Sequence, residues 1–380
     1  MCGIAGFVND MPIDVKCPVL QRMTDMIAHR GPDSEGHYID EHAALGHRRL
    51  SIIDLGGGQQ PIYNEDGSKV ITFNGEIYNY QTLREELIAA GHTFTTKSDT
   101  EVLLHGYEQW GVDLLQRVRG MFTFVIWDKN KQELFGARDH FGIKPFYYAK
   151  MNGTFMYASE IKSLLRHPDF VKELNAEALK PYMTFQYPAI GETFFKGVYK
   201  LPEGHYFTYR DGKMDIHRYY DEDFREGKQK LGELVNSIDQ TVCDSVKAHQ
   251  IADVEVGSFL SSGVDSSYVA AVARPQHTYS IGFGKGTYNE SQQAGELAEL
   301  LKLNNTAESL TDEEAFAAFP RIQWHLDEPD SNPSCVPLYF LSALAAKDVK
   351  VVLSGEGADE LFAGYIDYGV HTKFRPIKVV

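Results

Sequence analysis

Short apolar runs separated by Gly, Asn and Asp dominate the first 210 residues of the chain. Runs of this length that are rich in β-branched and aromatic residues predict strands; they occupy residues 3–8, 50–53, 70–73 and 121–127. Two other stretches place apolar residues at helical spacing and predict helices at 80–90 and 100–110. We therefore expect an α+β fold with stacked, mostly antiparallel sheets in this part of the chain.

The pattern changes after residues 211–230, a polar and charged segment that is predicted to be a linker between two domains. From residue 231 to residue 380, strands alternate with helices. Strands are predicted at 254–260, 277–283 and 349–353, and helices at 231–251, 266–273, 290–302, 312–325 and 337–347. Because such alternation is typical of βαβ units, we expect a parallel sheet in this second domain.

The amino-acid composition and net charge exclude several classes of protein. Apolar residues make up 43% and charged residues 24% of the chain, as is usual for a globular protein. The net charge of −16 argues against nonspecific binding to nucleic acid or to anionic membranes. No apolar run approaches the roughly 20 residues that span a bilayer, and the 4 cysteines lack the spacing of a disulfide framework or a zinc site. We expect a cytoplasmic enzyme with no nucleic-acid or membrane partner.

The N-terminus carries the first candidate for chemistry. If Met1 is removed, Cys2 bears a thiol and a free α-amino group, whose reference pKa is about 7.7–8.0. Such an amine can be neutral near pH 7 and accept the thiol proton, so one residue would supply both a nucleophile and its base. A cysteine at position 2 is by itself more typical of a small buried side chain, and the interpretation therefore depends on the rest of the chain.

Two loops of the second half are candidates for phosphate binding. Residues 261–267 (SSGVDSS) lie between a predicted strand and a predicted helix, where small residues and the helix N-terminus suit an anion. The loop lacks the Gly-Lys pair of a Walker A motif, and the alternative is an ordinary turn capped by serines. Residues 354–360 (SGEGADE) follow another strand and could meet the first loop at one sheet edge, or could simply be an acidic helix start.

Polar residues of the first half suggest acyl-transfer chemistry. The Asn74 amide and the Gly75 N–H could form an oxyanion hole, although Asn-Gly is also the commonest hairpin-turn dipeptide. Arg49 and Asp99 could hold the α-carboxylate and α-ammonium of an amino acid. The alternatives are a surface ion pair for Arg49 and a helix cap for Asp99.

Taken together, these residues resemble the glutamine-dependent asparagine synthetase family. The first domain is similar to class II, N-terminal-nucleophile glutamine amidotransferases, and the second to the ATP pyrophosphatase (PP-loop) fold. The resemblance covers essentially all 380 residues. It implies an αββα sandwich over residues 1–210 and a Rossmann-like α/β domain over residues 231–380. The matching stretches are residues 1–6 (MCGIAG), 29–33 (HRGPD), 49–52 (RLSI), 74–76 (NGE), 98–101 (SDTE), 261–267 and 354–360.

The resemblance implies a role for each matched position of the first domain. Cys2 would attack the side-chain amide of glutamine, forming a glutamyl thioester and releasing ammonia. Asn74 and Gly75 would hold the oxyanion. The glutamine itself would be bound by Arg49, Asn74, Glu76 and Asp99. Ammonia would pass through an internal tunnel to the second domain.

In the second domain the resemblance implies that Mg-ATP adenylates the β-carboxylate of aspartate, so the cofactors would be ATP and Mg²⁺. Glu356 would be the base that deprotonates ammonia, and Asp265 and Asp359 would be the magnesium ligands. The nucleotide and its pyrophosphate would contact Leu260, Ser261, Gly263, Asp265, Ser266, Ser267, Ser354 and Gly355. Ammonia would displace AMP to give asparagine. The resemblance also implies a homodimer.

The chain departs from the family pattern in two ways. Ser262 stands where the pyrophosphate loop usually has Gly, and a Cβ there would restrict the loop if φ were positive. The synthetase domain of the family normally continues past residue 380, so we expect a C-terminally truncated form. Three other functions remain open: a related amide ligase acting on another carboxylate, a glutaminase only, and a non-catalytic binding or regulatory protein.

Overall fold

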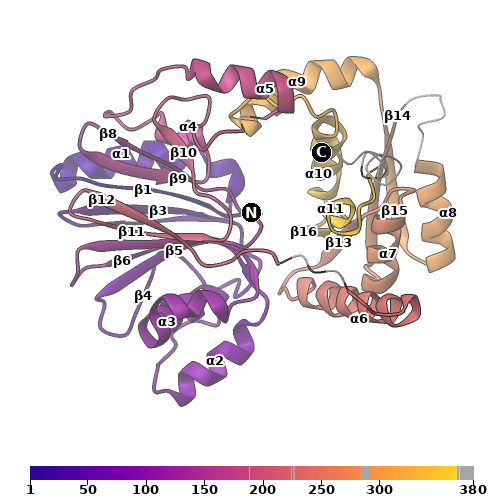
Figure 1. The fold of residues 1–380 in the computed structure, drawn as a ribbon, viewed down its shortest axis with the longest axis horizontal. Coiled ribbons are helices and arrows are strands. Elements are labelled where there is room, and N and C mark those ends of the chain that lie inside the picture. The colour runs from indigo at the N-terminus through magenta and orange to yellow at the C-terminus, as the bar shows by residue number, and fades with distance from the viewer. Residues whose placement is uncertain (188, 224, 226, 284–290, 366–367, 369–380) are drawn as a thin grey trace, which may run out of the picture. The chain divides into compact units, whose positions relative to one another are not determined.

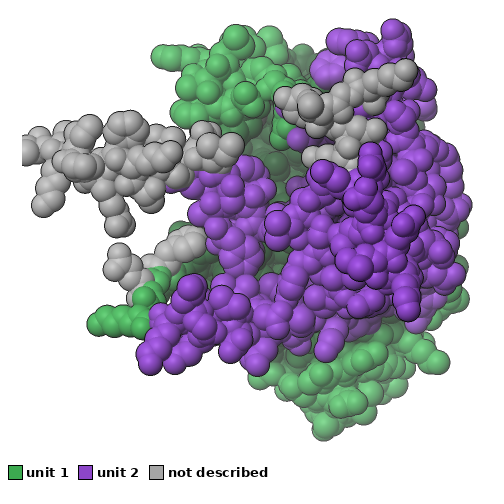
Figure 2. All heavy atoms as spheres, turned by 90° about the vertical axis from the view of Figure 1, so that its right-hand side faces the viewer, with its two compact units in different colours: residues 1–228, 323–332 green, residues 229–322, 333–380 purple. Residues whose placement is uncertain are grey.

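The computed structural model describes residues 1–187, 189–223, 225, 227–283, 291–365 and 368 (Figure 1). The chain divides into two compact units, which Figure 2 draws in different colours. Unit 1 contains residues 1–228 and 323–332, and unit 2 contains residues 229–322 and 333–380. Antiparallel sheets in the first unit and a parallel sheet in the second confirm the predicted fold class. Among the described helices, none has both the length and the apolarity that crossing a membrane requires.

Two antiparallel sheets form the centre of unit 1 as far as the chain is described (Figure 1). The first sheet has the order β10-β8-β9-β1-β3-β2, with β1 (Gly3–Val8), β2 (Ser34–Ile39), β3 (Ala43–Arg49), β8 (Tyr147–Met151), β9 (Thr154–Ala158) and β10 (Val198–Lys200). The second has the order β12-β11-β7-β6-β5-β4, with β4 (Ile62–Tyr63), β5 (Lys69–Ile77), β6 (Gly120–Asp128), β7 (Glu133–Arg138), β11 (His205–Arg210) and β12 (Lys213–Arg218).

Three hydrophobic clusters hold these layers together. Ile4 of β1 belongs to the cluster between the two sheets, whereas Ala5 and Phe7 of the same strand pack with helix α1 (Ile13–Asp25). Both faces of β1 are therefore buried, which explains its unbroken apolar sequence. On the outer face of the second sheet, a third cluster joins β5 and β6 to helices α2 (Tyr80–Ala89) and α3 (Asp99–Trp110). The result is an αββα sandwich, in which the short helix α4 (Ile161–Leu164) also packs against the first sheet, and the chain continues through the short helix α5 (Leu179–Phe185).

Unit 2 is built on a parallel sheet of order β15-β14-β13-β16 within the described residues. Its strands are β13 (Val256–Phe259), β14 (His277–Phe283), β15 (Asn304–Leu310) and β16 (Val351–Leu353). Apolar side chains of α6, α7 and α8 and those of α10 belong to separate clusters that pack with the strands and loops of this sheet. The helices are α6 (Leu231–His249), α7 (Val264–Ala273), α8 (Ser291–Leu301), α10 (Cys335–Ala345), α11 (Ala358–Phe362) and α9 (Asp312–Leu326), whose last residues, 323–326, belong to unit 1.

The structure corrects several predicted elements. Residues 50–53 are not a strand, because β3 ends at Arg49 and the following backbone turns so that the carbonyls of Ile53 and Asp54 accept hydrogen bonds from that arginine. Part of the predicted linker, residues 213–218, forms β12, a polar strand at the edge of its sheet. The pattern also missed α1 and the polar edge strand β15. Residue 290, the expected start of α8, lies outside the described residues.

Candidate active site

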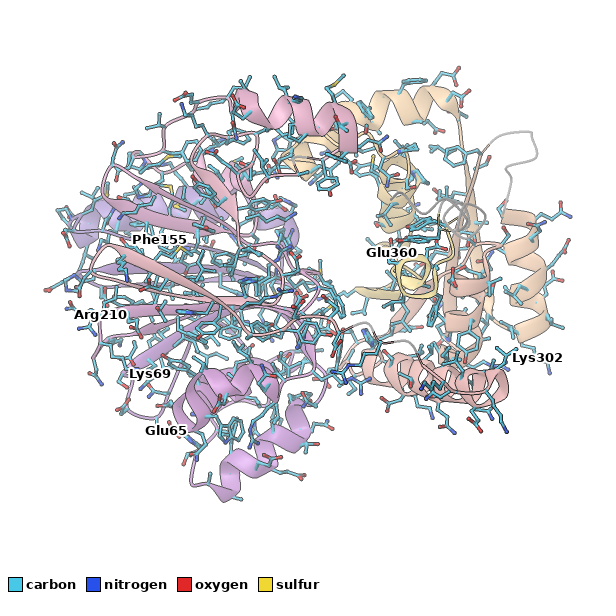
Figure 3. The ribbon with its side chains drawn as sticks, in the orientation of Figure 1. Glu65, Lys69, Phe155, Arg210, Lys302 and Glu360 are labelled. Atoms are coloured by element: carbon cyan, nitrogen blue, oxygen red, sulfur yellow. The ribbon has the colours of Figure 1, made fainter. Side chains whose placement is uncertain are left out.

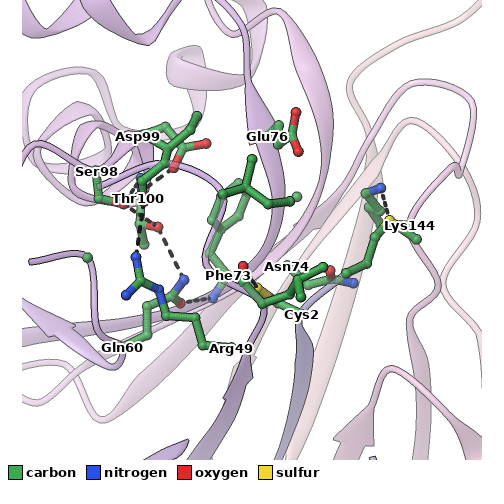
Figure 4. Close-up of a pocket in the computed structure, with 16 residues that line it drawn as sticks. Cys2, Arg49, Gln60, Phe73, Asn74, Glu76, Ser98, Asp99, Thr100 and Lys144 are labelled. Atoms are coloured by element: carbon green, nitrogen blue, oxygen red, sulfur yellow. Dashed lines mark hydrogen bonds between the residues drawn. The ribbon is translucent and has the colours of Figure 1, made fainter. Parts of the chain in front are cut away.

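Cys2 lies in a pocket of unit 1 to which several strands and helices contribute (Figure 4). Its thiol donates a weak hydrogen bond to the Leu50 carbonyl, with a sulfur–oxygen distance of 3.7 Å. The pocket brings Cys2, Arg49, Asn74, Gly75, Glu76 and Asp99 together, although they are spread over the first 99 residues. The other lining residues are Met1, Leu50, Ile52, Ile53, Gly58, Gln60, Phe73, Ser98, Thr100 and Lys144.

Asn74 and Gly75 lie inside β5, so the hairpin-turn alternative is wrong. They pair with Thr123 and Phe122 of β6. A Cβ at Gly75 would lie 2.1 Å from the Met121 carbonyl oxygen, so the close strand pairing requires glycine there. The Asn74 side chain is 1% exposed, and neither its Nδ2 nor its Oδ1 has a hydrogen-bond partner. A buried amide without a partner is costly, which is typical of a group that awaits a ligand.

Two carboxylates, Glu76 and Asp99, line the same pocket and are both buried. Asp99 is the first residue of α3, but the cap is its neighbour Ser98, whose side chain accepts a hydrogen bond from the Thr100 N–H. Asp99 instead accepts a hydrogen bond from the Ile77 N–H at 3.0 Å. Burial raises the pKa of Asp99 to about 6, and burial together with the Asp99 charge raises the pKa of Glu76 to about 7. This pair of carboxylates favours a cationic ligand such as an α-ammonium group.

Arg49, at the end of β3, is 5% exposed, so it is not a surface ion pair. Its Nη2 donates to the carbonyls of Ile53 at 3.0 Å and Asp54 at 2.7 Å. These bonds fix the guanidinium against the loop that follows β3. The fixed cation can then receive an anionic group such as an α-carboxylate.

Sequence reasoning missed two polar residues of the pocket. Lys144 is 2% exposed, and its ammonium contacts the sulfur of Met1. Burial lowers the pKa of Lys144 to about 8, although Glu76 opposes that shift. Gln60 accepts a hydrogen bond from the Phe73 N–H at 2.6 Å and donates one to the Thr100 hydroxyl at 3.2 Å, so it bridges β5 and α3. The sequence contains one local indication of Lys144, which is a charged residue between the apolar Ile143 and Pro145, an unusual context for a charge.

The electrostatics around Cys2 separate the two groups that its chemistry needs. Burial raises the pKa of the Cys2 thiol, which keeps it protonated in the resting state. Burial lowers the pKa of the Met1 α-amino group to about 6, with Arg30 and Lys144 contributing in the same direction. The N-terminal amine of Met1 is therefore in an environment that favours its neutral form, the form that can accept a proton.

An ion-pair network lies behind Cys2. Arg30 donates through Nε to the Cys2 carbonyl at 3.0 Å and through Nη1 to Glu160 at 3.0 Å. Lys162 joins Glu160 to Asp327, 2.8 Å away. Burial works against ionisation of Glu160, but His29, Arg30 and Lys162 together lower its pKa to about 2. The network therefore fixes the backbone of Cys2 through the hydrogen bond from Arg30.

Replacing Glu160 with glutamine should destabilise the protein in a pH-dependent way. The folded-state pKa lies below the unfolded value of 4.5, so the stabilising contribution is complete above pH 4.5 and disappears as the pH falls towards 2. Removing one partner of a buried ion pair typically costs about 3–5 kcal/mol. Urea unfolding of Glu160→Gln and of the exposed control Glu177→Gln between pH 7 and pH 3 checks this. A loss of stability that does not shrink on acidification would contradict it.

In unit 2 the two glycine-containing loops meet, as the sequence predicts. Strands β13 and β16 are parallel neighbours, with Ser258 opposite Leu353, so the loops that follow them leave the same edge of the sheet. A Cβ at Gly355 would lie 2.7 Å from the Ser266 N–H nitrogen and 2.9 Å from the Asp265 Cβ. Only glycine at position 355 permits this approach of the second loop to the first. The contact brings the second loop close to the backbone N–H groups at the start of α7.

Serine hydroxyls organise the first of these loops. Ser261 accepts a hydrogen bond from the Gly263 N–H at 3.1 Å, and its hydroxyl lies 2.8 Å from that of Ser266. Ser267 donates to the Gly263 carbonyl at 2.6 Å. Ser262 is not in the left-handed region of backbone conformation, so its Cβ causes no strain.

The remaining predicted residues of unit 2 lie around this loop pair. Leu260 is 3% exposed and packs in the hydrophobic cluster with α7 and α8, so it anchors the start of the loop in the core. Ser354 and Glu356 are exposed, and Asp265 and Asp359 are partly exposed. Carboxylates beside a backbone cradle fit a magnesium ion whose other ligands are phosphate oxygens and water. The predicted roles of these residues in binding and catalysis stay predictions.

Comparisons with known proteins cover both units. Residues 1–220 match a family model described as "Glutamine amidotransferase domain", and residues 237–376 match one described as "Asparagine synthase". The chain is 44% identical to asparagine synthetase [glutamine-hydrolyzing] 1 of Bacillus subtilis over 100% of this chain and 61% of that protein. It is 39% identical to a putative glutamine-hydrolysing asparagine synthetase of Mycobacterium tuberculosis over 99% of this chain and 62% of that protein.

A third relative is covered over more of its length. The chain is 34% identical to putative asparagine synthetase [glutamine-hydrolyzing] 2 of Methanocaldococcus jannaschii, over 97% of this chain and 76% of the relative. The chain thus spans about three fifths of the length of the first two curated relatives and about three quarters of the third.

Proposed function

The chain belongs to the family of glutamine-hydrolysing asparagine synthetases, and we propose on that premise that it makes asparagine from aspartate with ammonia taken from glutamine. Unit 1 would hydrolyse glutamine and unit 2 would activate aspartate with ATP. The observation that carries the proposal is the unpartnered, buried Asn74 amide in one pocket with the Cys2 thiol.

The geometry of this pocket supports the following first half-reaction. After loss of Met1, the α-amino group of Cys2 accepts the thiol proton, and the sulfur attacks the amide carbon of glutamine. Asn74 Nδ2 and the Gly75 N–H stabilise the oxyanion that forms. The C–N bond then breaks, the amine returns the proton to the leaving nitrogen, and ammonia departs from a glutamyl thioester. Water hydrolyses the thioester to glutamate and restores the thiol.

Recognition of glutamine is assigned to the charged groups of the pocket. Arg49 binds the α-carboxylate, and the carboxylates of Asp99 and Glu76 bind the α-ammonium. Both carboxylates have raised pKa values, and a bound ammonium group would lower them again. The α-ammonium group of the ligand therefore balances the negative charge of the two carboxylates. A simple amide has no such group, so the pocket favours an amino acid.

The second half-reaction is assigned to the loop pair of unit 2. A carboxylate is a poor electrophile, so the aspartate β-carboxylate attacks the α-phosphorus of ATP and expels pyrophosphate. The N–H groups and hydroxyls of residues 261–267 would hold the pyrophosphate, with Ser354 and Gly355 at the nucleotide. Asp265 and Asp359 would hold Mg²⁺, which neutralises phosphate charge. Ammonia then displaces AMP, and Glu356 accepts its proton.

Making ammonia within the protein solves a problem of protonation. Ammonia in free solution is mostly protonated at pH 7, and the resulting ammonium ion has no lone pair with which to attack. Ammonia that is released from an amide and kept away from water reaches its acceptor in the reactive form. The proposal that the acceptor is aspartate rests on family membership, because the site residues do not themselves name the carboxylate.

A product assay with isotope-labelled glutamine tests the proposal. The protein is incubated with Mg-ATP, aspartate and glutamine that carries heavy nitrogen in its side-chain amide, and the products are identified by mass spectrometry. Asparagine with a heavy amide, formed together with AMP and pyrophosphate, is the expected result. Glutamate without AMP would restrict the activity to a glutaminase. AMP formation with a different carboxylate, but not with aspartate, would make the chain a related amide ligase.

A further inference from the structure

A cluster of histidine and glutamate side chains lies in unit 1 outside the Cys2 pocket, and nothing in the proposed reaction uses it. Its members are Glu65, His92, His105 and Glu108. Glu65 lies in the turn between β4 and β5 (Figure 3), His92 lies in the connection between α2 and α3, and the other two belong to α3. Each residue offers one nitrogen or oxygen atom, and these four atoms lie within 4.8 Å of one another.

The separations between the ring nitrogens and the carboxylate oxygens of these side chains, with both oxygens of Glu65 taken into account, suit a metal centre. His105 Nδ1 lies 3.2 Å from Glu108 Oε2 and 3.3 Å from Glu65 Oε2. His92 Nδ1 lies 3.1 Å from Glu65 Oε1. In a tetrahedral zinc site with ligand bonds of roughly 2.0–2.1 Å, neighbouring ligand atoms are about 3.3 Å apart. A single Nδ1 proton on His105 can serve only one of the two carboxylates that face it, whereas one cation can serve both.

Two of the ligands have outer contacts that are typical of metal sites. His92 Nε2 lies 3.3 Å from Gln109 Oε1 and can donate its proton there, which leaves the Nδ1 lone pair directed inwards. His105 Nε2 lies 3.5 Å from Glu101 Oε1 and makes no hydrogen bond within the described residues. Glu108 uses its other oxygen to accept hydrogen bonds from Asn64 at 2.7 Å and Lys69 at 3.4 Å, so Oε2 is directed at the cluster.

The charges around His105 also favour a cation. Its side chain is 1% exposed, and it lies between three carboxylates, those of Glu65, Glu101 and Glu108. Lys69 is the one ammonium within ion-pair distance of Glu108 in the described residues. A divalent ion together with Lys69 would therefore balance the charge of the three carboxylates.

We propose that Glu65, His92, His105 and Glu108 bind one divalent transition-metal ion, with Zn²⁺ the best match to this set of two imidazoles and two carboxylates. The ion ties two loops to α3. The same helix begins at Asp99, which lines the Cys2 pocket, so the metal stabilises the element that presents a glutamine-binding carboxylate. Glu65, whose side chain is 35% exposed, provides the route of entry. The role is structural and does not depend on the proposed function.

Metal titration of the full chain tests this proposal. The protein is stripped with a chelator, freed of the chelator and titrated with ZnCl₂ in competition with a chromophoric indicator. We expect one tight equivalent per chain, a melting temperature that rises by several degrees when Zn²⁺ is added, and the visible absorption of tetrahedral Co²⁺ when CoCl₂ replaces zinc. His92→Gln, at a partly exposed position, and Glu65→Gln, at an exposed one, should lose the site while keeping the native circular dichroism spectrum.

Two control variants make the test specific. His42→Gln removes a partly exposed histidine that lies 3.8 Å from the Asp10 carboxylate in the same unit, and it should keep the equivalent of zinc. Cys2→Ala removes the thiol that could otherwise bind cobalt, and it should keep the absorption band. The proposal is overturned if the unsubstituted chain takes up no stoichiometric Zn²⁺, or if His92→Gln and Glu65→Gln bind it as tightly as the unsubstituted chain does.

Discussion

Replacing Cys2 with alanine should abolish glutamate release from glutamine while leaving synthesis from added ammonia unchanged. The Cys2 thiol is the strongest nucleophile among the side chains of the pocket, whereas the hydroxyls there, those of Ser98 and Thr100, are hydrogen-bonded to each other and to Asp99 at the start of α3. Loss of a catalytic nucleophile typically lowers kcat by more than about a thousandfold. Two assays of Cys2→Ala separate the activities. The first measures glutamate formation from glutamine, and the second measures AMP formation with aspartate, Mg-ATP and an ammonium salt.

The serine variant sharpens this experiment. Cys2→Ser keeps the shape of the side chain and its possible contact with the Leu50 carbonyl, but the hydroxyl is a much weaker nucleophile. Equal loss in the alanine and serine variants therefore assigns the loss to the sulfur rather than to packing. If both variants also lost the ammonia-dependent reaction, the assignment of the two half-reactions to separate sites would be wrong.

The parts of the fold that the sequence predicts are those in which one local pattern decides the structure. Strands such as β1 and β6 have largely apolar sequences because both of their faces are covered, and helices α2 and α3 carry apolar residues at helical spacing. Glycines in the sequence indicated positions where two segments of backbone come close together, as at Gly75 and Gly355. These positions also belong to the candidate sites, so the same signals indicated both fold and function.

The parts that the sequence does not predict depend on tertiary contacts. The edge strand β15 has one buried residue, Leu310, so its sequence is polar and shows no alternation. Helix α1 contains Pro18 and buries Lys16, whose ammonium donates to the carbonyls of Asp40 and Glu41, so its pattern is interrupted. Lys144 reaches the Cys2 pocket from a loop more than a hundred residues away in sequence. No spacing rule connects such residues.

The histidine and glutamate cluster shows the same limit. His105 and Glu108 are three residues apart on a helix, a pairing that is visible in the sequence. Glu65 and His92 join them only because the turn after β4 and the chain entering α3 lie beside that helix. The spacing of the four residues matches no zinc motif, so the proposed metal site depends on the fold.

Asn74→Ala should lower kcat for glutamine hydrolysis by roughly a hundred- to a thousandfold, the usual effect of removing one oxyanion-hole donor. The KM for glutamine should change much less, because the Asn74 amide acts mainly on the charge that develops in the transition state. The variant should unfold at the same temperature as the unsubstituted chain or a higher one, since the buried amide has no hydrogen bond to lose. Steady-state kinetics and thermal unfolding check the two halves of this prediction.

Asn175 provides the matched control for this prediction. It is 4% exposed, but its amide donates to the Thr193 carbonyl at 2.9 Å and accepts from the Glu177 N–H at 3.2 Å. Asn175→Ala should therefore lower the melting temperature and leave kcat unchanged, the opposite of the result at Asn74. The contrast separates a buried amide that stabilises the fold from one that is held unpaired for a reacting substrate. If Asn74→Ala destabilised the protein while kcat stayed the same, Asn74 would be a structural residue, and the oxyanion would need another donor.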